Sequence, residues 1–130
     1  MRLAVCAQGK GLSAEVDQRF GRCSHFVIVD TEKGELVDSI HNVSAEAAGG
    51  AGPQAAQLLA GLDVDAVALG NVGPNAAAAL EAAKIKVYSG VTGTVETTMQ
   101  KFIDGKLTPV SEATVSSHSG MRGREGGRNQ

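Results

Sequence analysis

The feature that most constrains the fold is an apolar run followed by glycine, proline and an alanine-rich segment. Residues 65–70, DAVALG, are apolar after the first position, which is typical of a parallel strand covered on both faces. Residues 71–84, NVGPNAAAALEAAK, favour a helix, and residues 85–90, IKVYSG, form the next apolar run. A strand, a helix and a strand in this order predict a parallel β–α–β unit.

The N-terminal part of the chain predicts three further strands. Residues 2–7, RLAVCA, are a short apolar run that ends at a glycine-containing turn. Residues 25–30, HFVIVD, and 35–42, ELVDSIHN, flank the turn TEKG at 31–34, so this pair predicts a hairpin.

Two more helices complete the expected α/β fold. A flexible loop of small residues, 44–52, precedes a helix expected to begin at Pro53, whose missing N–H has no partner in a first turn. The last helix is expected at 94–106. Its apolar residues recur at helical spacing: Val95, Met99, Phe102 and Ile103. The prediction is a mixed five-stranded sheet in the order strand–strand–strand–helix–strand–helix–strand–helix, with helices on its faces.

The chain of 130 residues is long enough for one domain, which we expect over residues 1–112. Residues 113–130 are expected to be a disordered tail rich in glycine and arginine, because residues 118–130 hold four glycines, three arginines and almost nothing apolar. This tail is either a solvated terminus or an arm that contacts an anionic partner or the protein's own ligand.

The charge balance and the apolar runs exclude several function classes. The formal net charge is −2, whereas a general nucleic-acid binder would show a basic face. No run approaches the roughly 20 apolar residues that span a bilayer, and the first apolar run breaks at Gln8, too early for a signal peptide. We therefore expect a cytoplasmic protein that binds neither nucleic acid nor membrane and keeps its two cysteines as thiols.

Three glycine-rich turns follow strands and predict where a ligand would bind. In open α/β sheets, ligands gather outside the carboxyl ends of the parallel strands. Two of the turns, GAGP at 50–53 and GNVGPN at 70–75, lead into helices whose N-termini favour an anion. No GK[ST] sequence occurs, so nucleotide hydrolysis by a phosphate-binding loop is not expected. Each turn taken alone is also consistent with a simple connection between a strand and a helix that binds no ligand.

Residues 17–26, DQRFGRCSHF, concentrate scarce residue types in one segment. Arg19 and Arg22 can fork hydrogen bonds onto an anion, and Gly21 allows a tight turn. Cys23 lies beside a cation that favours its thiolate, and His25, two positions later, is expected to face the same way. The structural alternative is a surface loop with arginines paired to Asp17 and a buried, inert thiol.

Three other residues are secondary candidates. Cys6 is expected to be a core residue of the first strand. Alternatively, it contacts Cys23 if the loop folds back over the end of the strand. His41 ends the third strand at the level of the glycine loops, and Phe20 reads as a hydrophobic anchor for its loop.

Several motifs in the same order resemble the dinitrogenase iron–molybdenum cofactor biosynthesis family, which includes NifX-like and Orange-Protein-like carriers, the latter from anaerobic sulfate reducers. The matching segments are VDQRFGRCSHFVIVD, GAGPQAAQLL, GNVGPNAAAAL and IKVYSGVTGTVETTMQKFIDGKL, and the resemblance covers about residues 1–110. It implies a ribonuclease-H-like α/β fold. Many relatives have alanine at the position of Cys23, so the resemblance does not imply that Cys23 is a metal ligand.

The resemblance implies a protein that is not an enzyme and that carries or stores an anionic metal–sulfur cluster. The cluster would be a molybdenum–copper sulfide or an iron–sulfur or iron–molybdenum precursor, held non-covalently or partly by cysteine. The resemblance also implies a MinD-type ATPase with a ferredoxin-like domain as a possible partner, and we expect a monomer or weak dimer. The residues expected to border the cofactor are Arg19, Phe20, Gly21, Arg22, His41, Gly50, Gly52, Asn71, Gly73 and Asn75, with Cys23, His25 and Cys6 as candidate metal ligands.

Two other functions are compatible with such a domain. A nuclease of the ribonuclease H type needs clustered carboxylates for two metal ions, and the first strand, RLAVCA, contains no acid. A metal-free regulatory module that uses the loops as a protein-binding surface remains the alternative to the cluster carrier.

Overall fold

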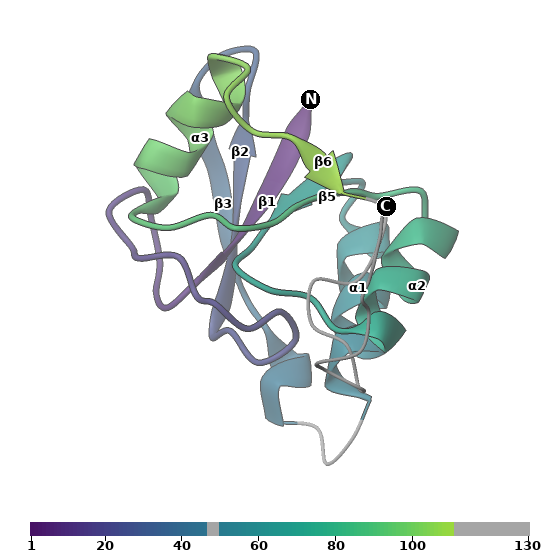
Figure 1. Ribbon diagram of the computed structural model, residues 1–130. Coiled ribbons are helices and arrows are strands. Elements are labelled where there is room, and N and C mark those ends of the chain that lie inside the picture. Colours follow the sequence, from purple (N-terminus) through teal and green to yellow (C-terminus); the bar gives the residue numbers. More distant parts are fainter. Residues whose placement is uncertain (47–49, 111–130) are drawn as a thin grey trace.

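The computed structural model describes residues 1–46 and 50–110 (Figure 1). The predicted tail at 113–130 lies outside the described residues. The elements are β1 Arg2–Ala7, β2 His25–Asp30, β3 Glu35–His41, the 3-10 helix η1 Val43–Glu46, α1 Ala51–Gly61, β4 Ala66–Ala68, α2 Pro74–Ala82, β5 Lys86–Tyr88, α3 Val95–Ile103 and β6 Pro109–Val110.

The described strands form one mixed sheet in the order β3-β2-β1-β4-β5-β6. β1 pairs antiparallel with β2 and parallel with β4, and β5 continues the parallel part. α1 and α2 lie together on one face of the sheet, and α3 lies on the other (Figure 1). The mixed α/β class expected from the sequence is therefore confirmed.

The sheet has six strands rather than the expected five. β6 has only two residues, and it pairs antiparallel with β5 through Val87 opposite Val110 and Tyr88 opposite Pro109. A segment this short shows no alternation of apolar and polar residues, so its pairing with an edge strand is a tertiary event that local sequence does not signal.

The segment before α1 is also more ordered than expected. Residues 43–46 form η1, although the sequence predicted a flexible loop from residue 44. α1 begins at Ala51, two residues before Pro53, because Gly50 takes a left-handed conformation (φ 69°) and caps the helix there.

The sheet separates two apolar clusters, and β1 contributes to both. Cys6 packs on the side of α1 and α2, where Leu59 and Leu80 are fully buried. Leu3 and Val5 pack on the side of α3. Both faces of the central strands are covered, as their continuous apolar sequence predicts.

The apolar stripe predicted for α3 is only partly buried. Val95 and Met99 lie in the core, but Ile103 is 42% exposed and Thr98 is fully buried in the helix. Thr98 tolerates burial because its hydroxyl donates to the Thr94 carbonyl at 3.0 Å. None of the described helices is long and apolar enough to span a bilayer.

Candidate functional site

The segment 17–24 forms a loop at the carboxyl end of β1, and backbone contacts to the loop after β4 hold it in place. The Phe20 N–H donates to the Asn71 carbonyl at 3.4 Å, and the Asn71 N–H donates to the Gln18 carbonyl at 2.9 Å. The loop in which the sequence concentrated scarce residues therefore lies against one of the glycine turns, as the site prediction requires.

One buried side chain, Asn42, fixes the other side of this loop. Its Nδ2 donates to the carbonyls of Gly21 at 3.1 Å and Cys23 at 2.9 Å, and the residue has no exposed surface. The sequence does not indicate this role of Asn42, because a polar residue after a strand is usually an exposed turn residue and nothing local indicates its burial.

Glycines allow the loops and helix ends to approach one another closely. Gly21 has φ 93°, and a Cβ built there would lie 3.0 Å from the Gly52 nitrogen. A Cβ at Gly52 would lie 2.8 Å from the Ala76 Cβ, closer than side chains pack. These two glycines bring the loop 17–24, the start of α1 and the start of α2 into contact.

The joined loops form three adjoining hollows, which we call the loop surface. The first has a volume of about 520 Å³, and the second and third have about 260 and 290 Å³. Arg19 and Gln18 line the first and third, while Phe20 and Gly73 line the second and third. The other lining residues are Gln8, Asp17, Arg22, Ser24, Gly50, Ala51, Gly52, Pro53, Asn71, Pro74, Asn75 and Ala76.

The loop surface gathers most of the predicted cofactor-bordering residues. Gln8, Asp17, Gln18 and Ser24 belong to it as well and were not predicted. They lie beside predicted residues in the chain or in the first glycine turn, so including whole turns instead of selected residues would have found them.

Both arginines of the loop are exposed and oriented by contacts with the protein. The Arg19 Nε lies 3.5 Å from an oxygen of Asp17, while the Arg19 side chain remains 71% exposed. The Arg22 guanidinium donates to the Ala45 carbonyl at 2.9 Å. Asp17 offsets part of the charge of Arg19, but it also holds the guanidinium at the rim of the first hollow.

Two helix N-termini meet at the second hollow. It is lined by the caps and first turns of α1 and α2, from Gly50 and from Gly73. Neither helix has a side-chain cap or an acidic residue in its first turn. The positive ends of both helix dipoles therefore face a space that suits an anion.

The two cysteines lie in the core beneath the loop. Cys6 and Cys23 are both fully buried free thiols in the cluster under α1 and α2. Burial and a hydrogen bond with Cys23 raise the pKa of the Cys6 thiol well above its ordinary value. The loop thus folds back so that Cys23 meets Cys6, which was one of the alternatives for Cys6.

The structure separates Cys23 from His25, contrary to the expectation that they face the same way. Cys23 packs in the same cluster as Phe26, and His25 precedes Phe26 in β2, so alternation directs it to the opposite face. The reason is that β2 begins at His25, leaving Cys23 in the loop, where period-two alternation does not apply. His25 instead meets His41 on β3, and neither residue lines the three hollows.

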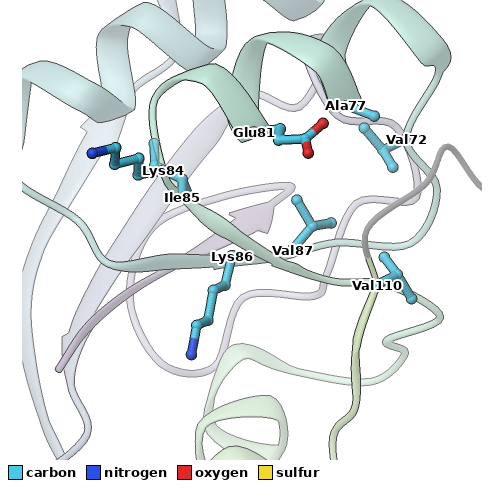
Figure 2. A pocket seen from close by; sticks show the side chains of 8 residues that line it. All are labelled: Val72, Ala77, Glu81, Lys84, Ile85, Lys86, Val87 and Val110. Carbon is cyan, nitrogen blue, oxygen red and sulfur yellow. The ribbon is translucent and has the colours of Figure 1, made fainter.

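A separate apolar pocket of about 220 Å³ lies between α2, β5 and β6. Figure 2 shows Val72, Val87 and Val110 around it, with Glu81 nearby and the Lys86 side chain directed away. No residue predicted for the site lines this pocket, and its two lysines, Lys84 and Lys86, direct their side chains away from the valines (Figure 2). The chemistry suggested by the sequence belongs to the loop surface.

Within residues 1–46 and 50–110, no group of three or more histidine, cysteine or acidic side chains is arranged to hold a metal ion. What the loop surface offers instead is charge, helix N-termini and shape. Such a surface can bind a preassembled anion.

Comparisons with known proteins agree with this architecture. The apo form of the orange protein from Desulfovibrio gigas has a TM-score of 0.83 and 39% identity, covering 88% of this chain and 96% of its own. A Thermotoga protein that belongs to the DUF35 family has a TM-score of 0.74 and 38% identity, covering 88% of this chain and 97% of its own.

The sequence comparisons cover most of the chain. An uncharacterised protein from Methanocaldococcus jannaschii is 34% identical over 109 residues, which is 82% of this chain and 89% of that protein. The family profile described as "Dinitrogenase iron-molybdenum cofactor" matches residues 1–105. The chain belongs to the dinitrogenase iron–molybdenum cofactor family.

Proposed function

We propose that the protein binds an anionic metal–sulfur cluster, or its precursor, as cargo on the loop surface and passes it to a partner without catalysing a reaction. One observation carries this proposal: Arg19, Arg22 and two uncapped helix N-termini converge on adjoining hollows. Metal–sulfide clusters are anions, so this convergence offers them both charge and hydrogen-bond donors.

Phe20 adds an apolar element to the same surface. It lines the second and third hollows and packs against Phe26 with ring centroids 5.9 Å apart. A polarisable sulfide surface can pack against such a ring while the rim supplies charge. Retention by charge and shape fits the loop surface better than a cage of ligands, and full burial makes Cys23 at most an accessory.

The family and the orange protein support this choice of cargo. We propose a molybdenum–copper sulfide or an iron–sulfur or iron–molybdenum precursor as the cluster. As the receiving partner we propose a MinD-type ATPase with a ferredoxin-like domain. We also propose that the fold is of the ribonuclease H type.

The experiment is an anaerobic titration of the full chain with tetrathiomolybdate, with and without copper, followed by the charge-transfer absorption. Arg19→Ala and Arg22→Ala should each weaken binding by up to about 1 kcal/mol, and by more where the bound cluster excludes water. Lys84→Ala and Lys86→Ala are matched controls, because they remove exposed cations beside the apolar pocket and not at the loop surface.

The outcomes separate the alternatives. Equal losses in the arginine and lysine variants would mean that only net charge matters, and the loop surface would not be the site. Cys23→Ser should keep the cluster with nearly unchanged colour, whereas loss of the cluster with an intact circular dichroism spectrum would make Cys23 a ligand. Failure to take up any metal–sulfide would favour a metal-free regulatory module.

A further inference from the structure

Two histidines that the loop surface does not use lie side by side at the end of the β2–β3 hairpin. His25 begins β2 and His41 ends β3, and the antiparallel register places them directly opposite each other. Their ring centroids are 5.5 Å apart at an interplanar angle of 74°. His25 is half-buried and His41 is exposed, so both rings are within reach of an ion from solvent.

The hydrogen bonds around the pair show which kind of cross-strand pair it is. The Asn42 N–H donates to the Ser24 carbonyl at 2.9 Å, which joins the residues that flank the two histidines. Flanking bonds of this kind mark a non-hydrogen-bonded pair, in which the Cα atoms are only about 4.5 Å apart and the side chains are closest. The backbone therefore brings the imidazoles to the shorter of the two separations that a sheet offers.

The ring separation is close to that of a chelate. A metal–nitrogen bond of about 2.1 Å places a ring centroid about 3.2 Å from the ion, so two ligands at 90–110° have centroids roughly 4.5–5.3 Å apart. The observed 5.5 Å reaches this range with small rotations about the side-chain torsions, which are soft for histidine.

Ser24 contacts the imidazole of His25 and orients its ring. Its hydroxyl donates to the Ala7 carbonyl at 3.3 Å and also lies 3.0 Å from the Nδ1 of His25. When the hydroxyl donates to the carbonyl, which can only accept, the serine oxygen accepts the Nδ1–H of His25. This tautomer leaves the lone pair on Nε2, and a second group that fixes the imidazole in this way is typical of histidine metal ligands.

Two features of the surroundings of His25 act on its charge and on that of a bound cation. Burial, His41 and Lys10 lower the pKa of His25 below its ordinary value of 6.5, which favours the neutral imidazole that binds metal. Lys10 also opposes a cation, but its side chain is exposed and can turn away.

We infer that His25 and His41 form a two-histidine chelate for a late first-row divalent metal ion, with water in the remaining positions. Imidazole nitrogens suit nickel, copper and zinc, and two of them without carboxylates do not suit calcium or magnesium. The metal-binding side chains of this site differ from those of the cluster site proposed above, and the ion is a cation in place of an anion. The two sites share Ser24, which lines the first hollow and contacts His25.

Calorimetric titration of the full chain with Ni²⁺ tests the inference, because nickel does not oxidise thiols under these conditions. One ion should bind per chain, and the NMR signals around His25 and His41 should broaden. His25→Ala and His41→Ala should each reduce the affinity tenfold or more, because either change removes one arm of the chelate. His118→Ala is the matched control, since His118 is the third histidine of the chain and should leave the affinity unchanged.

Other results would overturn the inference. Absence of binding up to millimolar nickel, unchanged affinity in His25→Ala, or loss of binding in His118→Ala would each do so. Arg19→Ala separates this test from that of the cluster site, because it should weaken thiomolybdate binding and leave nickel binding intact. A circular dichroism spectrum and unfolding midpoint like those of the wild type are required of each variant.

Discussion

The N-termini of the helices on the two faces of the sheet are built differently. On one face, α3 begins at Thr94, whose Oγ1 accepts from the Thr97 N–H at 3.2 Å, and Glu96 lies in its first turn. On the other face, the N-cap residues of α1 and α2 are Gly50 and Gly73, and neither helix has a side-chain cap or an acid in its first turn. The first turn of α3 has a hydrogen-bond acceptor in its own cap side chain, whereas the first turns of α1 and α2 have no such side chain.

This difference shows where the protein gives up local stability. A side-chain cap contributes roughly a few tenths of a kcal/mol more than a glycine at the same position, and α1 and α2, with Gly50 and Gly73 there, forgo this contribution. They are stabilised instead by packing, with Leu59 and Leu80 fully buried, and by the close approach at Gly52. The caps and first turns of both helices line the second hollow, so the helix ends without side-chain caps lie at the proposed anion site.

The largest effect is expected from Asn42, because the loop beside the uncapped helices depends on this one side chain. Asn42→Ala would leave the buried carbonyls of Gly21 and Cys23 without their donor. We expect the free energy of unfolding to fall by about 3 kcal/mol, measured by urea denaturation. Asn71→Ala is the control, since the Asn71 side chain is exposed, and a similar loss there would contradict the role given to Asn42.

An intermediate effect is expected at the capped helix. Thr94→Ala removes the side-chain cap of α3 and should lower the free energy of unfolding by about 1 kcal/mol. Anion binding should not change, because Thr94 lines none of the three hollows. Thermal denaturation and the thiomolybdate titration measure the two quantities, and weaker binding in this variant would show that the two faces are coupled.

The smallest effect on stability, and one of opposite sign, is expected from an acid placed in α2. Asn75→Asp adds a negative charge to the first turn of α2 and should stabilise the protein by about 0.5 kcal/mol through the helix dipole. The same charge should weaken anion binding at the second hollow. Glu96→Gln is the counterpart in α3: it should cost a similar amount of stability and leave binding unchanged. If Asn75→Asp left the anion affinity unaltered, the helix N-termini would not be part of the anion-binding site.

Sequence reasoning located most of the described secondary structure. The ranges of β1 and β2 match the apolar runs 2–7 and 25–30, because such runs bounded by turn residues have few alternative conformations. The convergence of the loop 17–24 with the glycine turns was also predictable, since the carboxyl ends of parallel strands meet at one edge of the sheet. The roles of individual loop residues were less predictable.

The sequence by itself determined the α/β class, the positions of the strands and the residue types available at the loop surface. Only the tertiary structure decided that Cys23 is buried against Cys6, that His25 pairs with His41, and that Asn42 holds the loop. The physical reason is that strands and helices follow from periodic local patterns, whereas a loop residue has no period. Its direction and burial depend on which distant segments pack against it.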